Sequence, residues 1–222
     1  MTNKINQYVS VSALKYYFQV SNYYVLRKIG VVLFPWRHKP WSRQMVRSET
    51  SGIIDGYATA RDDINAPDMY IPVMAFTTYV LLTSVFAGLH GTFHPKILGY
   101  VTSKAIIFML GELLVLKLGT YLLSSGSKLL DFVAYSGYKF IGITLTLLAS
   151  SLFSSSTFKW GVFAYTATSN SFFLLRSLRY ILLPDSNTSS ASTFNSGQRQ
   201  RRIQFLFFYS FICQFILMWF LV

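Results

Sequence analysis

The sequence has few charged residues, and acidic ones are the scarcest. Only 13% of its 222 residues are charged, whereas 52% are hydrophobic and 18% are aromatic. A soluble domain typically carries roughly 25% charged residues, and half that share cannot cover a water-facing surface. The mean hydropathy of +0.40 agrees with this. Lipid is therefore the expected solvent for much of the chain.

Cysteine and histidine are also scarce, which excludes two kinds of site. The one cysteine, Cys213, rules out an intrachain disulfide framework and a cysteine-based metal cluster. His90 and His94 have the spacing of two ligands on one helix face. However, Gly91 and Pro95 make this stretch a loop, and no acid or cysteine lies nearby. We therefore expect neither a metal site nor a cofactor.

The chain lacks the usual signature of a serine hydrolase. A nucleophilic serine needs a histidine or lysine within hydrogen-bond reach, and Ser136 and Lys139 in "AYSGYK" are the candidate pair. No Gly-x-Ser-x-Gly elbow is present, and none of the long apolar runs contains a histidine. Small residues beside glycine in a membrane helix more often permit close helix contact. We therefore expect no catalytic residues and a non-enzymatic protein.

The charge that is present is mostly positive. The formal net charge is +12, from 20 Lys and Arg against 8 Asp and Glu. Such an excess indicates either nucleic acid or anionic lipid as a partner. The sequence has no dense Lys/Arg run, zinc-ligand spacing or RNA-binding signature. With this hydropathy the lipid bilayer is the expected partner, and nucleic acid is not.

Five long apolar runs follow Asp68, each near the ~20 residues that a helix needs to cross the hydrocarbon core. The prolines at positions 67 and 72 suit a helix start, where a missing backbone donor costs little. We predict an all-α polytopic membrane protein with a cytosolic segment over 1–68 and a transmembrane domain over 69–222. Its bundle of five transmembrane helices is expected at about 70–89, 97–123, 132–153, 158–183 and 203–222.

Lysine and arginine are unevenly distributed around these runs, and short flanks rich in them stay on the cytosolic side of a membrane. Nine precede the first run: Lys4, Lys15, Arg27, Lys28, Arg37, Lys39, Arg43, Arg47 and Arg61. The linker before the last run adds Arg199, Arg201 and Arg202, whereas the other side would hold Lys96 and Lys159. The bias predicts a cytosolic N-terminus and, with five crossings, a lumenal or external C-terminus.

The segment before the first run has its own helical pattern. Apolar residues recur at helical spacing near 9–34, basic residues lie between them, and Pro35 ends the pattern. We predict amphipathic helices there, which either lie in the headgroup plane or pack on the cytosolic face of the bundle. The acids of "DDINAPDMYIP" either stay in water or set the angle between this segment and the bundle.

Several ionisable residues fall inside the predicted crossings, where each charge costs roughly 2.5–3.5 kcal/mol on insertion scales. Three interpretations are open. The long bases extend to the cytosolic headgroups while the one acid pairs with a base, or they line a basic pocket for an anionic lipid headgroup. Alternatively, the acid serves an ion or proton pathway, which usually needs more acids or broken helices near the midplane. This candidate intramembrane charge cluster is Glu112, Lys117, Lys139, Arg176 and Arg179.

The chain resembles a known family in four blocks that appear in family order. They read "VSVSALKYYFQVSNYYVLRKIGVVLFP", "DDINAPDMYIPVMAFTTYVLL", "LLDFVAYSGYKFIG" and "FFLLRSLRY". These are similar to the YIF family (Yip-interacting factors), five-span members of the YIP group of early secretory pathway membrane proteins. Together the blocks cover nearly the whole chain.

The resemblance implies a location and a set of partners. Family members reside in the endoplasmic reticulum (ER) membrane, the Golgi membrane and ER-Golgi transport vesicles. They form a heteromeric complex with a YIP-family membrane protein, associate with Rab-type small GTPases and support ER-to-Golgi transport. No catalytic residues belong to the family. Its members usually carry a longer flexible N-terminal extension before the block that starts here near Tyr8, so contacts made by that extension are not expected from the printed residues.

Our first hypothesis is a non-enzymatic membrane adaptor in vesicle-mediated protein transport. Its cytosolic segment would meet a GTPase, a vesicle coat component or an anionic leaflet. The residues expected to make partner or membrane-surface contacts are Lys15, Tyr16, Tyr17, Tyr24, Arg27 and Lys28. Gly137 and Gly142 are expected to allow close helix packing, either with a partner helix or with this chain's own helices.

Two alternatives remain. A small transporter or channel would show an internal repeat and interrupted helices around Glu112, and the spacing of the runs shows no convincing repeat. A lipid-handling or bilayer-shaping protein would share the architecture of the adaptor and would depend on its basic surface.

Overall fold

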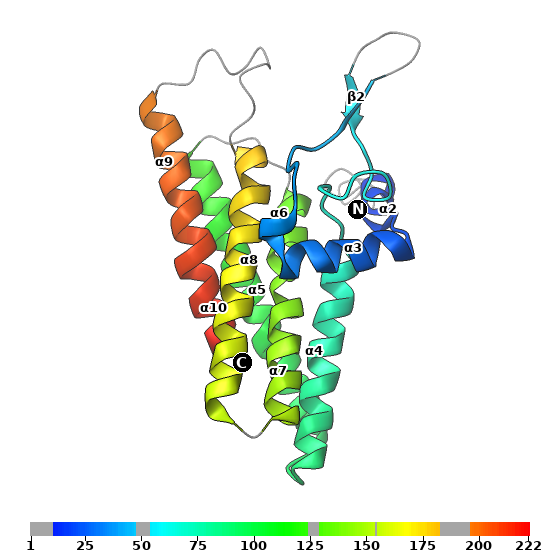
Figure 1. Ribbon diagram of the computed structural model, residues 1–222, viewed down its shortest axis with the longest axis vertical. Coiled ribbons are helices and arrows are strands. Elements are labelled where there is room, and N and C mark those ends of the chain that lie inside the picture. Colours follow the sequence, from blue (N-terminus) through cyan, green and yellow to red (C-terminus); the bar gives the residue numbers. More distant parts are fainter. Residues whose placement is uncertain (1–10, 48–53, 124–128, 154, 183–195) are drawn as a thin grey trace, which may run out of the picture.

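The computed structural model describes residues 11–47, 54–123, 129–153, 155–182 and 196–222. Long helices run side by side as a bundle, and a smaller N-terminal region packs against one part of it (Figure 1). The predicted fold class, an all-α polytopic membrane protein, is confirmed. The one addition in the described residues is a short two-stranded sheet in the N-terminal region.

The bundle is built from five long helical segments. The first two are α4 (Tyr70–Leu89) and α5 (Pro95–Leu122). The third is α6 (Leu129–Gly137), which continues after Tyr138 as α7 (Lys139–Leu152), and the fourth is α8 (Ser156–Leu182). The last is α9 (Ser196–Phe207), followed without a break by the π-helix η3 (Phe208–Cys213) and by α10 (Gln214–Leu221).

These bounds match most of the predicted runs. The run at 70–89 coincides with α4, whereas the last helix begins well before the predicted start at 203. Its first turns carry arginine and glutamine, so hydropathy alone places the boundary too late. Residues 9 and 10 of the predicted N-terminal helices, and residue 183 at the end of the predicted fourth crossing, lie outside the described residues.

Four segments among the described residues are long and apolar enough to cross a membrane: Tyr70–Leu89, Pro95–Leu122, Leu129–Leu152 and Arg199–Leu221. Helix α8 is not among them. Its inward side carries buried polar residues, Thr166, Ser169, Asn170, Ser171 and Ser177. A helix surrounded by other helices can bear such residues because protein rather than lipid meets them. The count of five crossings therefore stays a prediction.

The entry into α4 shows why the chain turns there. The Asp68 carboxylate accepts the backbone N–H of Ile71 at 2.8 Å, which satisfies one of the unpaired donors in the first turn. Pro72 stands in the same turn, where its missing N–H costs nothing. The Met69 N–H donates to the carbonyl of Tyr17 at 3.0 Å. The start of α4 is thus bonded to the N-terminal region.

That N-terminal region consists of α2 (Val11–Phe18), α3 (Asn22–Leu33), the 3-10 turn η1 (Pro35–Arg37) and the strands β1 (Met45–Arg47) and β2 (Ile54–Tyr57). The strands are antiparallel. Helix α3 begins at a serine cap, where Ser21 Oγ accepts the N–H of Tyr24. It lies across the bundle helices rather than along them (Figure 1). We call residues 11–69 the cap region.

Two apolar clusters form most of the core. The one near the cap joins α3 to the bundle through Val32, Tyr138, Phe173 and Leu178, among others. The second lies farther along the bundle and centres on Phe140 and on residues of α4, α8 and α10. The cap and the bundle therefore share one core.

Candidate functional site

Asp68 joins three elements at the junction of the cap and the bundle. Its carboxylate accepts the hydroxyl of Tyr24 at 3.0 Å, the hydroxyl of Tyr138 and the backbone N–H of Ile71. These donors come from α3, from the residue between α6 and α7, and from α4. A buried carboxylate is tolerated because its oxygens are fully engaged. Asp68 therefore holds the cap on the bundle.

Lys28 lies beside Asp68 and is 1% exposed. Its Nζ donates to the carbonyls of Ile64 at 2.6 Å and Ala66 at 3.0 Å. Burial lowers the pKa of Lys28 to about 8, although Asp68 and Asp63 act in the opposite direction. The two carbonyls accept two of the hydrogens of this amine. Lys28 is thus an internal link rather than a surface contact.

Asp131, in the first turn of α6, holds the other end of the cap. The Tyr17 hydroxyl donates to one carboxylate oxygen, and the Arg43 guanidinium lies 3.6 Å from the other. Arg43 also donates to the hydroxyl of Tyr16 at 3.2 Å. Burial and the bond to Asp131 raise the pKa of the Tyr17 hydroxyl, so it acts as a donor at ordinary pH.

The acids before α4 do not all stay in water, which corrects one of the two expectations for this loop. Asp63 is 2% exposed and Asp68 is fully buried. Asp63 accepts the backbone N–H groups of Gln44 and Asn65, each at 2.9 Å. The loop therefore sets the position of the cap, while Asp62 remains exposed.

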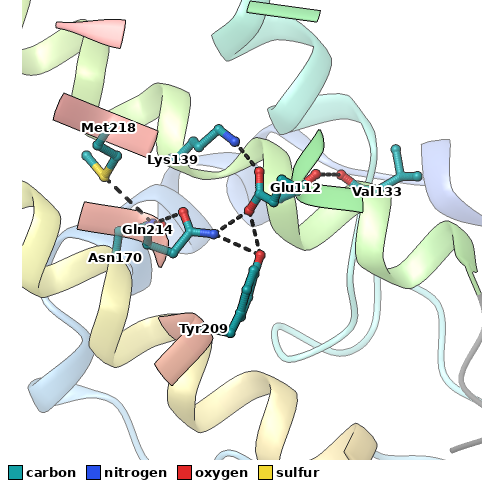
Figure 2. Close-up of polar contacts among 8 residues, drawn as sticks. Glu112, Val133, Lys139, Asn170, Tyr209, Gln214 and Met218 are labelled. Atoms are coloured by element: carbon teal, nitrogen blue, oxygen red, sulfur yellow. Dashed lines mark hydrogen bonds and ion pairs between the residues drawn. The ribbon is translucent and has the colours of Figure 1, made fainter. Parts of the chain in front are cut away.

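A second polar cluster lies inside the bundle (Figure 2). Glu112 of α5 and Lys139 of α7 form an ion pair, and they are 1% and 0% exposed. Glu112 also accepts the hydroxyl of Tyr209 at 2.5 Å and the amide of Gln214. The Gln214 amide oxygen lies 3.4 Å from the side-chain nitrogen of Asn170 on α8. The acid and its partners thus link four helical segments of the bundle, and we call these five residues the Glu112 cluster.

The π-helix explains how one helix supplies two partners to the same acid. Tyr209 and Gln214 are five residues apart, which on a regular α-helix places them about 140° apart around the axis. The wider turn of η3, over Phe208–Cys213, brings both side chains toward Glu112 (Figure 2). The Gln214 amide also donates to the Tyr209 hydroxyl at 2.8 Å.

The structure assembles only two members of the predicted charge cluster. Glu112 and Lys139 meet, as in the interpretation that paired the acid with a base. Lys117, Arg176 and Arg179 are exposed on the outside of the bundle. Lys117 is five residues from Glu112 and therefore points away from it. The predicted cluster of five is therefore corrected to an internal pair and three outward bases.

The predicted contact residues of the cap also divide. Lys15 and Arg27 are exposed and Tyr16 is half-buried. Tyr17, Tyr24 and Lys28 are buried in contacts within the chain, so they are removed from the set of surface residues. Hydrophobic spacing misassigned them because aromatic and lysine side chains with polar ends can satisfy internal acceptors.

The outward residues of α3 that sequence reasoning missed are Tyr23 and Leu26, which are 72% and 74% exposed. These two residues define an outer face of α3. In the sequence, its only indication is that both lie within four positions of Arg27.

Gly137 and Gly142 pack against this chain's own helices. A Cβ at position 137 would lie 2.4 Å from the Cβ of Pro72, and one at 142 would lie 3.0 Å from Thr166. Ser136 donates to the carbonyl of Val133 at 3.0 Å, while Lys139 pairs with Glu112, so the two do not form a nucleophile and base pair. Within the described ranges, no group of three or more His, Cys, Asp or Glu residues is placed to hold a metal.

Comparison with known proteins gives the chain its relatives. It is 47% identical over 204 residues to the protein transport protein yif1 of Schizosaccharomyces pombe, covering 91% of this chain and 69% of that protein. It is 35% identical over 221 residues to the protein YIF1A of Danio rerio, covering 99% and 69% of the two chains. It is 35% identical over 212 residues to the protein transport protein YIF1 of Saccharomyces cerevisiae, covering 91% and 65%.

No solved structure matches the chain. The sequence pattern of the YIF1 family matches residues 1–222, which is the full printed length. Together with the relatives, this match confirms the family to which the four sequence blocks point. The chain belongs to the YIF1 family.

Proposed function

We propose that this chain is a non-enzymatic membrane adaptor in ER-to-Golgi vesicle-mediated protein transport. It acts in a complex with a YIP-family membrane protein and with Rab-type GTPases, and vesicle coat components are further candidate partners. Two relatives with 47% and 35% identity carry the name protein transport protein, which supports the transport role. The Lys/Arg bias supports an orientation with the N-terminus in the cytosol and the C-terminus in the lumen.

The observation that carries this proposal is the bonding of the cap to the bundle. Asp68, at the end of the cap, accepts the hydroxyl of Tyr138 in the bundle, and Asp131 in α6 accepts the hydroxyl of Tyr17 in the cap. A cap held at two places presents a surface of fixed shape next to the membrane. Such a surface suits recognition of a soluble partner, because it loses little conformational entropy when the partner binds.

Purification of the full chain from cells in mild detergent tests the proposal. We expect a YIP-family membrane protein and a Rab-type GTPase to co-purify. Reversing one exposed cap charge, Lys15→Glu, should reduce recovery of the GTPase and leave the membrane partner bound. Lys96→Glu, an exposed charge at the start of α5, is the matched control. Recovery of neither partner from cells that contain both would contradict the proposal.

A transporter or channel is the second candidate, and the buried acid Glu112 is the observation in its favour. Glu112→Gln separates the two. A transporter should lose flux in liposomes and keep its partners, whereas an adaptor should show at most weaker assembly or lower stability. Loss of ion or solute flux specific to this variant would favour the transporter.

A further inference from the structure

Helix α3 has a second face that nothing in the described chain covers. Tyr24, Lys28 and Val32 point into the protein and are 3%, 1% and 2% exposed. On the opposite side, Tyr23 and Leu26 are 72% and 74% exposed. Single exposed apolar residues are ordinary, but a helix with large apolar residues on both faces is unusual for contact with water.

An exposed aromatic cluster at the end of α3 connects this helix to α8. Phe34, Trp36 and Tyr165 pack edge to face, with ring centroids 5.6 to 6.2 Å apart. The rings are 45%, 48% and 40% exposed. The Tyr165 hydroxyl donates to the carbonyl of Leu33 at 3.0 Å, which ties the end of α3 to α8. Tryptophan and tyrosine are enriched where a membrane meets water.

The position of α3 in the fold agrees with a location at the boundary between membrane and water. It has 12 residues and is therefore ~18 Å long, too short to span the hydrocarbon. It lies across the bundle near the start of α4, where the chain passes from bonded acids to an apolar run (Figure 1). A helix in that place, with one face on protein and one open, meets lipid headgroups and the upper part of the acyl chains.

The charges in the segment that carries the outer face, residues 22–39, are all positive. Arg27, Arg37 and Lys39 are exposed on the same segment, and the first acidic residue of the whole sequence is Glu49. Arg176, exposed on α8, adds a further base on the outside of the bundle. Basic residues near an anionic leaflet are attracted to its phosphates. A patch of this sign complements phospholipid phosphate.

We propose that α3 and η1 form a wedge that inserts its outer face into one leaflet and binds anionic phospholipid headgroups. Tyr23, Leu26, Phe34 and Trp36 enter the boundary between headgroups and acyl chains, and Arg27 and Arg37 contact phosphates. The occupant of this face is lipid rather than a soluble protein. The wedge is a lipid-binding surface beyond the adaptor role, and it adds area to one leaflet only.

The first test measures the depth of Leu26 in liposomes of phosphatidylcholine and phosphatidylserine. The full chain carries Cys213→Ala and Leu26→Cys, labelled with an environment-sensitive fluorophore. We expect blue-shifted emission, and quenching by shallow spin-labelled lipids that exceeds quenching by deep ones. Gln44→Cys and Leu114→Cys, both on exposed residues, mark the aqueous and deep limits. Emission at position 26 that matches position 44 would overturn the wedge, as would shielding that appears only after a protein partner is added.

The second test concerns the headgroup. Quenching of the same probe by spin-labelled phosphatidylserine is expected to exceed quenching by spin-labelled phosphatidylcholine at least twofold. Arg27→Glu with Arg37→Glu should bring the ratio close to one, and Lys96→Glu should leave it unchanged. A ratio near one in the unmodified chain would overturn anionic selectivity. Both tests use lipid alone, so their outcome is independent of partner recovery.

Discussion

Lys28 shows how a single buried residue couples the cap to pH. It is enclosed by Asp68, Asp63, Arg43 and the rings around it, and burial lowers its pKa to about 8 from an ordinary value of 10.5. Below pH 8 the folded protein holds a buried charge, which the unfolded chain keeps in water. Between pH 8 and 10.5 the unfolded chain binds more protons than the folded one, so stability rises with pH.

We predict that the free energy of unfolding in detergent rises by roughly 2 kcal/mol between pH 7.5 and 9.5 because of Lys28. Lys28→Met should remove this rise, and its exposed neighbour Arg27→Met should keep it. The measurements should stop near pH 10. Burial raises the pKa of Tyr24, so above that pH the ionisation of tyrosine stabilises the unfolded state relative to the folded one. A flat profile in the unmodified protein would contradict the assignment.

The Glu112 cluster leads to a second prediction at this scale. Removing one partner of a buried ion pair leaves an uncompensated charge, at a cost of about 3–5 kcal/mol. Lys139→Met should therefore lower the thermal unfolding temperature strongly. The double variant Lys139→Met with Glu112→Gln should recover much of that loss, since no charge remains buried. If the double variant is less stable than the single one, the pair acts through packing rather than charge.

Arg202 connects helices at the level of elements. It is buried near the start of the last helix and donates to the carbonyls of Leu182 at 2.9 Å and Leu123 at 2.8 Å. Those carbonyls stand at the C-terminal ends of α8 and α5, where helices leave acceptors unpaired. A cation in this place also complements the negative end of each helix dipole. One arginine thus caps two neighbouring helices.

We predict that Arg202→Leu lowers the free energy of unfolding by ~2–4 kcal/mol, because two charge-assisted hydrogen bonds are lost. Arg201→Leu, on the exposed neighbour, should change it by less than ~0.5 kcal/mol. Thermal unfolding of the purified chain followed by circular dichroism measures both. Equal effects of the two substitutions would show that the capping bonds contribute little.

Glycine at the contact between α4 and α6 gives a further prediction about elements. A Cβ at Gly137 would lie 2.4 Å from the Cβ of Pro72, whereas a Cβ at Gly111 would meet open space. Gly137→Ala should therefore destabilise the bundle by roughly 1–3 kcal/mol through overpacking. Gly111→Ala should be neutral or slightly stabilising because alanine favours the helix. Detergent stability assays compare the two directly.

At the scale of the whole molecule, the two ends of the chain are predicted to lie on opposite sides of the membrane. A tag at the N-terminus should bind antibody when only the plasma membrane of cells is permeabilised. A tag at the C-terminus should bind only after internal membranes are opened too. Labelling of both tags under the milder condition would contradict an odd number of crossings, and with it the proposed cytosolic cap and lumenal C-terminus.

The sequence pattern predicted the apolar helices of the bundle best. The helix at 70–89 was predicted with its observed bounds, because the prolines and the apolar run mark its start. It failed for α9, whose first turns are basic, and it missed β1 and β2. At the site, it named Glu112 and Lys139 but also grouped them with three outward bases. Which face of a helix turns inward depends on the helices packed against it, so it cannot be predicted from the residues of that helix alone.

The sequence alone determined the membrane character of the chain and the family to which it belongs. Hydropathy settles the membrane character because each apolar helix satisfies its own backbone and can insert by itself. The four sequence blocks settle the family. Only the tertiary structure decided the pairing of Glu112 with Lys139 and the burial of Tyr24 and Lys28. Such contacts join residues far apart in the chain, and they depend on the rotation and crossing of helices. Packing, rather than hydropathy, sets that geometry.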